Sequence, residues 1–182
     1  MAAGKSPSAP HLLLTGFMGS GKTAVGRRLA AALGRPFADL DEQIAAAAGM
    51  SISGIFAVCG EEYFRELESR LLARLLYREQ PLVIATGGGA VVREANRELM
   101  RRRGRIIFLA ASLETILRRT AADDSRPLLA GAAAARRSKI KDLLAARRSF
   151  YDIHDLSIDT DGKTIAEITR EITARLGLDG SS

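Results

Sequence analysis

An apolar run, Leu12-Leu13-Leu14-Thr15, leads directly into the spacing G-x-x-x-x-G-K-T between Gly16 and Thr23. This spacing, between a strand and a helix, is typical of the loop that binds the phosphates of a nucleoside triphosphate. Its glycines let the backbone approach the phosphates where a Cβ would block the way. The helical spacing of Val25, Leu29 and Leu33 after the loop argues against a glycine-rich turn that matches by chance.

The phosphate loop also predicts how the nucleotide is bound. A lysine at position 22 neutralises charge on the β- and γ-phosphates, and the hydroxyl of Thr23 is placed to reach Mg²⁺. The helix that begins here presents unsatisfied N–H groups to the anion. We therefore expect ATP to be bound by Gly19, Ser20, Gly21, Lys22, Thr23 and Ala24.

The length of 182 residues predicts one domain with a substantial core, over residues 11–177. Residues 1–10 are small and polar, and we expect them to be a disordered leader, with 178–182 as a flexible tail. No apolar run approaches the ~18 residues of a membrane span. Cys59 is the only cysteine and follows an apolar stretch, so we expect it to be buried, in a cytoplasmic protein without disulfides.

Arginine supplies most of the net charge of +6. Two explanations compete: a nucleic-acid surface, or solvated helix faces together with a site for small anions. Aromatic residues make up only 5% of the chain and do not cluster with the arginine runs, which argues against nucleic acid. We expect Arg101 to Arg103 to be a solvated helix end and later arginine pairs to contribute to an anion site.

Short apolar runs alternate with longer helical patterns, which is typical of a doubly wound α/β fold. We predict a five-stranded parallel sheet flanked by helices, with the P-loop NTPase arrangement of nucleoside-monophosphate kinases, including a lid. The predicted strands are 12–15, 36–39, 82–86, 105–110 and 156–159, and the predicted helices are 22–33, 61–79, 93–103, 112–120, 136–150 and 164–176. Ligands of such sheets bind outside the carboxyl ends of the strands.

Two carboxylates follow the second predicted strand. Asp39 and Asp41 are two residues apart, so in an extended chain their side chains point to the same face. Many phosphate-loop enzymes hold the metal with an Asp at the end of another strand, but the run 82–85 ends in Thr86, which leaves Asp39 for that task. Asp41 then meets a substrate hydroxyl, unless it merely caps the helix that runs on through Glu42.

Two other segments suggest binding functions. The three glycines Gly87, Gly88 and Gly89 suit an anion bound by backbone N–H groups, or a ligand lying against the main chain, although a tight turn is the alternative. Residues 121–136 interrupt the fold pattern, and Arg126 within them suits a lid that neutralises the transferring phosphoryl group. An ordinary surface connection is the alternative there.

From about Leu12 to Leu176 the chain resembles the shikimate kinase family. The motifs that carry the resemblance are 16–23, Asp39-Leu40-Asp41, Ser53-Gly54-Ile55-Phe56 with Gly60-Glu61, Phe64-Arg65-Glu66-Leu67-Glu68, Thr86-Gly87-Gly88-Gly89, Arg126-Pro127-Leu128-Leu129, and Arg147 four residues before Tyr151. The phosphate loop alone fits many activities, whereas the whole set is specific.

The resemblance implies transfer of the γ-phosphoryl group of ATP to the 3-hydroxyl of shikimate, with Mg²⁺, in aromatic amino-acid biosynthesis. It makes Lys22, Asp41 and Arg126 catalytic. It places Thr23 and Asp39 at Mg²⁺, and Arg119 and Arg126 at ATP. Shikimate is then bound in a region of about 39–68 and by the residues Asp41, Arg65, Gly87, Gly88, Gly89 and Arg147, while Glu68 orients Arg65. The alternative is that Glu66 and Glu68 are ion-pair partners on the helix, and we favour it for Glu66 alone.

Three other functions are alternatives to a shikimate kinase. A gluconate kinase shares the phosphate loop and lid, but is not expected to combine the paired aspartates, the arginine–glutamate motif and the triple glycine. A GTPase needs a guanine-reading N-K-x-D motif, which is absent. An inactive regulatory relative is the third alternative. We expect a monomer that binds ATP and shikimate, and neither nucleic acid nor membranes.

Overall fold

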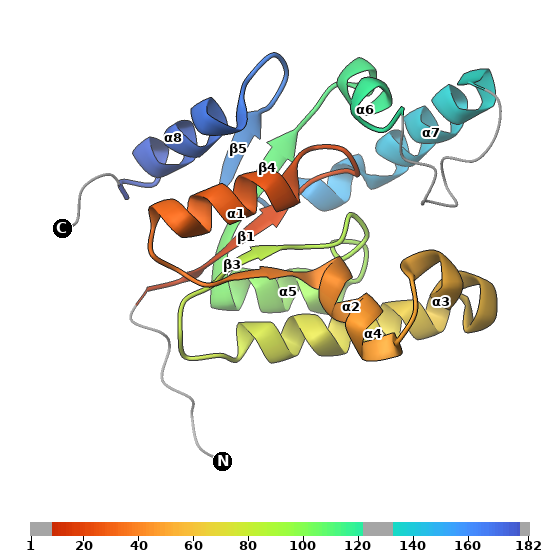
Figure 1. The fold of residues 1–182 in the computed structure, drawn as a ribbon, viewed down its shortest axis with the longest axis horizontal. Helices are drawn as coiled ribbons and strands as arrows, with labels where there is room; N and C mark the ends of the chain where they lie inside the picture. The colour runs from red at the N-terminus through yellow and green to blue at the C-terminus, as the bar shows by residue number, and fades with distance from the viewer. Residues whose placement is uncertain (1–8, 122–132, 179–182) are drawn as a thin grey trace.

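A computed structural model of the chain describes residues 9–121 and 133–178. Five parallel strands form one sheet in the order β2-β3-β1-β4-β5 (Figure 1). The strands are β1 His11–Thr15, β2 Phe37–Asp39, β3 Val83–Ala85, β4 Gly104–Ala110 and β5 Leu156–Asp159. The predicted five-stranded parallel sheet is confirmed, with strand ends that differ from the prediction by one residue or less.

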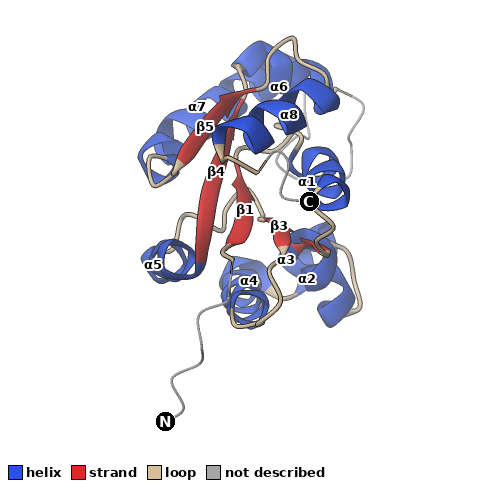
Figure 2. Cartoon of the chain, turned by 90° about the vertical axis from the view of Figure 1, so that its left-hand side faces the viewer, coloured by secondary structure: helices blue, strands red, loops and turns tan. Residues whose placement is uncertain are grey.

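Helices cover both faces of the sheet (Figure 2). Alternate residues of β1 point to opposite sides: Leu13 packs in the core beneath α4 and α5, whereas Leu12 and Leu14 pack against α1 and α8. Apolar side chains on both faces of a strand are the pattern of a parallel sheet buried between helices. The helices are α1 Lys22–Ala32, α2 Leu40–Ala48, α3 Ile52–Val58, α4 Gly60–Leu76, α5 Glu94–Arg103, α6 Leu113–Arg119, α7 Ala133–Tyr151 and α8 Ile165–Arg175.

Helix α3 was not predicted from the sequence, and its position corrects one expectation. Ser51 caps it, because the Ser51 side chain accepts a hydrogen bond from the Gly54 N–H group at 3.1 Å. Only one side of this short helix faces the core: Ile55 is buried, whereas Val58 is 77% exposed. Cys59, which follows it, is exposed, so the prediction that it is buried is wrong.

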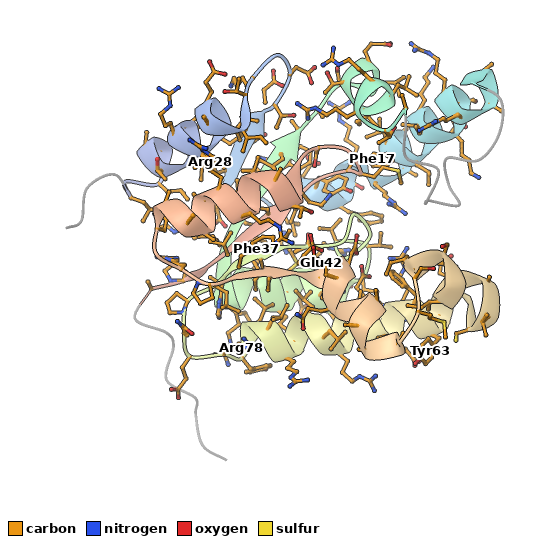
Figure 3. All side chains as sticks on the ribbon, viewed as in Figure 1. Phe17, Arg28, Phe37, Glu42, Tyr63 and Arg78 are labelled. Carbon is orange, nitrogen blue, oxygen red and sulfur yellow. The ribbon has the colours of Figure 1, made fainter. Side chains whose placement is uncertain are left out.

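The strand order places the crevice of the fold beside β1. The chain leaves β1 on one side toward β2 and β3, and it returns on the other side to β4 and β5. Ligands of doubly wound sheets bind at such a switch point, outside the carboxyl ends of the strands. In Figure 1 this edge lies toward the right, where the loop after β1 lies near the end of α7 and the loop after β3 lies between it and α2. Figure 3 labels Phe17 in that loop.

Candidate active site

The loop after β1 has the backbone that the glycines of the phosphate-loop motif predict. Gly16, Gly19 and Gly21 have φ angles of 144°, 75° and 95°, in the region that residues with a Cβ rarely adopt. Lys22 Nζ donates to the carbonyl oxygens of Gly16 and Phe17 at 2.9 and 3.0 Å. Lys22 is also the first residue of α1, so the ammonium group and the positive end of that helix face the same loop.

Thr23 in the first turn of α1 contacts Asp39 at the end of β2. The Thr23 hydroxyl donates to Asp39 Oδ2 at 2.6 Å, and Asp39 Oδ1 accepts from the backbone N–H groups of Asp41 and Glu42. Asp39 therefore caps α2, and the alternative in which Asp41 is the cap is wrong. A hydroxyl and a carboxylate are hard oxygen ligands, and only one Asp39 oxygen is used by the cap, so the pair fits Mg²⁺.

Asp41 reaches the site from the first turn of α2, because the extended chain ends at Asp39 and helix begins at Leu40. Its carboxylate lies against the triple-glycine loop: a Cβ added at Gly87 would be 2.7 Å from Asp41 Oδ1 and 2.8 Å from Glu68 Oε1. A methyl group at position 87 would therefore require these carboxylates, which approach from α2 and α4, to shift.

Arg65 lies between two glutamates on α4. Its Nη1 donates to Glu68 Oε2 at 3.1 Å and its Nη2 to Glu61 Oε1 at 3.0 Å. The Glu68 side chain is 1% exposed, and burial raises the pKa of its carboxyl group while the Arg65 guanidinium opposes that rise. Glu68 therefore restrains the direction of Arg65, as the resemblance implies, while Glu66 is exposed.

Arg147 approaches the same loop from α7. Its Nη1 lies 3.4 Å from the carbonyl oxygen of Gly88, and its guanidinium carbon lies 6.0 Å from the centre of the Phe17 ring. Tyr151, one turn further along α7, donates its hydroxyl to the same carbonyl at 2.7 Å. The loop is therefore held from α7 on one side and contacted by Arg65 of α4 at Gly89 on the other.

A cavity of about 780 Å³ joins these groups. Asp41, Arg65 and Arg147, which are distant in sequence, all line it, together with the triple glycine. Leu143 of α7 lines the cavity without any sequence motif that indicates it, as do Ser51 and Ile52, whereas Ser53 and Phe56 belong to the motif 53–56. The complete lining is Met18, Asp41, Ser51, Ile52, Ser53, Phe56, Glu61, Phe64, Arg65, Glu68, Gly87, Gly88, Gly89, Leu143 and Arg147.

Arg119 joins the phosphate loop to the segment after β5. Its Nη1 donates to the carbonyl of Gly19 at 3.3 Å and to the Thr160 hydroxyl at 3.1 Å, and its Nη2 donates to the Thr160 carbonyl at 2.9 Å. Thr160 in turn donates to the carbonyl of Ala110 at the end of β4. The Arg119 guanidinium thus lies beside the nucleotide-binding loop, where the resemblance implies contact with adenine.

Arg126 and most of the predicted lid, 121–136, lie outside the described residues, as do most of the predicted leader and tail. The ends of the lid are described: Arg136 contacts the carbonyl of Thr120, and Arg137 forms a two-pronged ion pair with Glu114. Within residues 9–121 and 133–178, no group of three or more Asp, Glu, His or Cys side chains is arranged so that it could hold a metal ion. Helices long and apolar enough to cross a membrane are also absent from those ranges.

A protein-family model described as shikimate kinase matches residues 18–177. This chain belongs to the shikimate kinase family. The shikimate kinase of Symbiobacterium thermophilum is 45% identical over 167 residues, which cover 91% of this chain and 95% of the relative. That of Geobacter metallireducens is 43% identical over 169 residues, which cover 93% of each. The resemblance stated from the motifs is confirmed.

Solved structures agree with this assignment. A shikimate kinase from Acinetobacter baumannii in complex with shikimate superposes with a TM-score of 0.88 at 37% identity, over 94% of this chain and 96% of that one. A gluconokinase from Sinorhizobium meliloti reaches a TM-score of 0.61 at 21% identity, over 94% of each chain. At that identity the likeness is one of fold alone. The predicted kinase fold is confirmed for this member of the shikimate kinase family.

Proposed function

We propose that this member of the shikimate kinase family transfers the γ-phosphoryl group of ATP to the 3-hydroxyl of shikimate, yielding shikimate 3-phosphate and ADP. The observation that carries the proposal is one cavity in which a carboxylate, Asp41, stands with two guanidinium groups, Arg65 and Arg147, beside a phosphate-binding loop. Shikimate is a small carboxylate with several hydroxyl groups. Arg65 and Arg147 suit the carboxylate and Asp41 suits a hydroxyl, while the other two lining carboxylates, Glu61 and Glu68, pair with Arg65.

The acceptor is oriented by its two polar ends. Arg65 and Arg147 bind the carboxylate, with the backbone of Gly87, Gly88 and Gly89 along the ring. Asp41 accepts a hydrogen bond from the 3-hydroxyl and either takes its proton or directs its lone pair toward the γ-phosphorus. Phosphoryl transfer needs little covalent chemistry from a protein, so this positioning supplies a large share of the acceleration.

The donor lies in the loop between β1 and α1. Backbone N–H groups of Gly19 to Ala24 surround the phosphates, and Lys22 exchanges its present carbonyl partners for β- and γ-phosphate oxygens. Arg119 lies along adenine while it remains bonded to Thr160. Arg126, outside the described residues, reaches the transferring phosphoryl group in the role that its motif implies.

Thr23 and Asp39 would hold Mg²⁺, the carboxylate through water, and the ion would supply neutralisation of phosphate charge. Asp39 keeps its capping bonds to α2 while it does so, which joins the metal site to the helix that carries Asp41. We further propose that the enzyme works as a cytoplasmic monomer, without nucleic acid or a membrane, in aromatic amino-acid biosynthesis.

An assay of ADP release with Mg²⁺ and ATP tests the proposal against its alternatives. The acceptor panel is shikimate, gluconate, several nucleosides and no acceptor, and phosphorus NMR identifies the phosphorylated hydroxyl. ADP release that depends on shikimate, with a single 3-phosphate product, is the expected result. ADP release that depends on gluconate and not on shikimate would make gluconate the substrate. No ADP release with any acceptor would favour an inactive regulatory relative.

A further inference from the structure

Tyr151 is a buried tyrosine at the end of α7 that contacts the active-site loop. Its side chain is 3% exposed and its ring stacks on Phe108 with 5.0 Å between ring centres. Its hydroxyl donates to the carbonyl of Gly88, 63 positions earlier in the chain, at 2.7 Å. Burial raises the pKa of the Tyr151 hydroxyl to about 12, so the group keeps its proton and remains a donor at neutral pH.

The Gly88 carbonyl has two potential donors from α7, and they are not equally engaged. Tyr151 is at 2.7 Å, an ordinary length for an O–H···O bond, whereas Arg147 Nη1 is at 3.4 Å, near the outer limit for any hydrogen bond. The hydroxyl is therefore the main partner of this carbonyl. The Gly88 carbonyl therefore engages the Arg147 guanidinium only weakly. Arg147 also lies within hydrogen-bonding reach of the Tyr151 hydroxyl, and it lines the cavity.

The same loop also touches the second arginine. At Gly89 the Arg65 guanidinium lies so close that an added Cβ would be 2.1 Å from Nη1. The carbonyl that Tyr151 holds and the N–H of Gly89 belong to one rigid peptide plane. Holding that plane from α7 therefore fixes the part of the main chain that separates Arg65 from Arg147.

We propose that Tyr151 is a positioning residue for the substrate carboxylate: its hydroxyl satisfies and holds the Gly88 carbonyl, which leaves Arg147 to bind the carboxylate at a fixed distance from Arg65. This inference rests on the proposed function. It assigns to Tyr151 no contact with the substrate and no part in the transfer step.

The variant Tyr151→Phe removes one oxygen and keeps the ring that stacks on Phe108. In it the Gly88 carbonyl loses its main donor and draws Arg147 closer, because a buried carbonyl without a partner is unfavourable. Shikimate then has to compete for that guanidinium. We expect its dissociation constant and KM to rise about tenfold, as for the loss of one hydrogen bond, while the KM for ATP and kcat change less than about twofold.

Calorimetric titration with shikimate and steady-state kinetics measure these quantities separately. The other two tyrosines supply matched controls, since Tyr63 is 44% and Tyr77 is 62% exposed. Figure 3 shows Tyr63 near the start of α4, and Tyr77 follows the end of the same helix. Tyr63→Phe and Tyr77→Phe lose the same oxygen, and we expect wild-type constants for shikimate from both.

A double-mutant cycle tests whether Tyr151 acts through Arg147. In an Arg147→Met background, Tyr151→Phe should change kcat/KM for shikimate less than about twofold, because the competing guanidinium is gone. The methyl ester of shikimate is a second probe, since it lacks the negative charge. Tyr151→Phe should weaken its binding much less than that of shikimate.

Three results would overturn the inference. The first is unchanged shikimate affinity in Tyr151→Phe, and the second is a full tenfold effect in the Arg147→Met background. The third is a loss of ATP affinity as large as the loss of shikimate affinity, together with a lower melting temperature. That result would make Tyr151 a general structural residue. Failure of the proposed function is distinct from these, because the wild-type chain would then neither bind nor phosphorylate shikimate.

Discussion

Replacing Gly89 by alanine would displace the guanidinium of Arg65. The added Cβ would lie 2.1 Å from Arg65 Nη1 and 2.8 Å from Cζ. Ordinary contact begins near 3.4 Å, so Nη1 must retreat by roughly 1.3 Å. The same Nη1 donates to Glu68 at 3.1 Å, and Glu68 is buried, so the retreat also disturbs the ion pair that directs Arg65.

The magnitude follows from two effects. Weakening one charge-assisted hydrogen bond to the substrate costs about 1.5–3 kcal/mol, and a misplacement of about 1 Å alone can cost about a hundredfold in rate. We therefore expect Gly89→Ala to reduce kcat/KM for shikimate between about tenfold and a hundredfold. The KM for ATP should stay near the wild-type value, because the three atoms nearest to the added methyl group all belong to Arg65 and none to the phosphate loop.

Steady-state kinetics at saturating ATP, with shikimate varied, provide the measurement. Gly88→Ala is the steric comparison, since a Cβ there meets nothing closer than 3.6 Å, and we expect a clearly smaller loss from it. A kcat/KM for Gly89→Ala within twofold of wild type would refute the reasoning. Equal losses in the two variants would refute it as well, since the close approach of Arg65 would then not be the cause.

Three further predictions concern single groups. Asp41→Asn should reduce kcat by about 10²–10⁴ with shikimate still bound, and near-normal turnover would remove its role as base or orienter. Lys22→Met should abolish ADP formation while calorimetry still detects shikimate, whereas loss of shikimate binding would indicate misfolding. Burial lowers the pKa of His11 below 6.5, and its Nδ1 accepts from the N–H of Leu82 at 3.1 Å, so the imidazole is neutral in the folded chain at pH 7. Because the unfolded chain gains this proton at a higher pH than the folded chain, stability should decline by up to about 1.4 kcal/mol per pH unit as the pH falls from 6.5 toward the lowered pKa. Urea unfolding at pH 7 and 5 should show a smaller decline in His11→Asn, and an identical decline would exclude His11 as a source.

Much of the fold can be predicted from the sequence because its signals are local. The strands around residues 12–15 and 104–110 are short apolar runs, and the phosphate loop is one continuous segment whose glycines specify its backbone. The helices α2 and α3 are harder to predict. Helix α3 has seven residues and only one strongly buried side chain, Ile55, so it has little periodicity, and the exposure of Cys59 was missed for the same reason.

The sequence predicts which residues form the site better than it predicts how they contact one another. Asp39 was assigned to the metal because it ends a strand, and the structure adds that it caps the helix that carries Asp41. From the sequence, the triple glycine suits an anion bound by backbone N–H groups or a ligand lying against the main chain, and the three glycines do line the cavity. In the structure, side chains from α2 and α4 fill the space beside Gly87 and Gly89, a constraint that no local pattern contains.

The sequence by itself determined that this protein binds a nucleoside triphosphate and which family it belongs to, because both depend on contiguous motifs in which neighbouring residues shape one stretch of backbone. The tertiary structure alone decided which of the many arginines enter the cavity. Arg65 and Arg147 are brought together only by the packing of α4 and α7 around the loop that follows β3. Side chains so far apart in sequence meet through the burial of apolar surface across the whole sheet, which no short segment encodes.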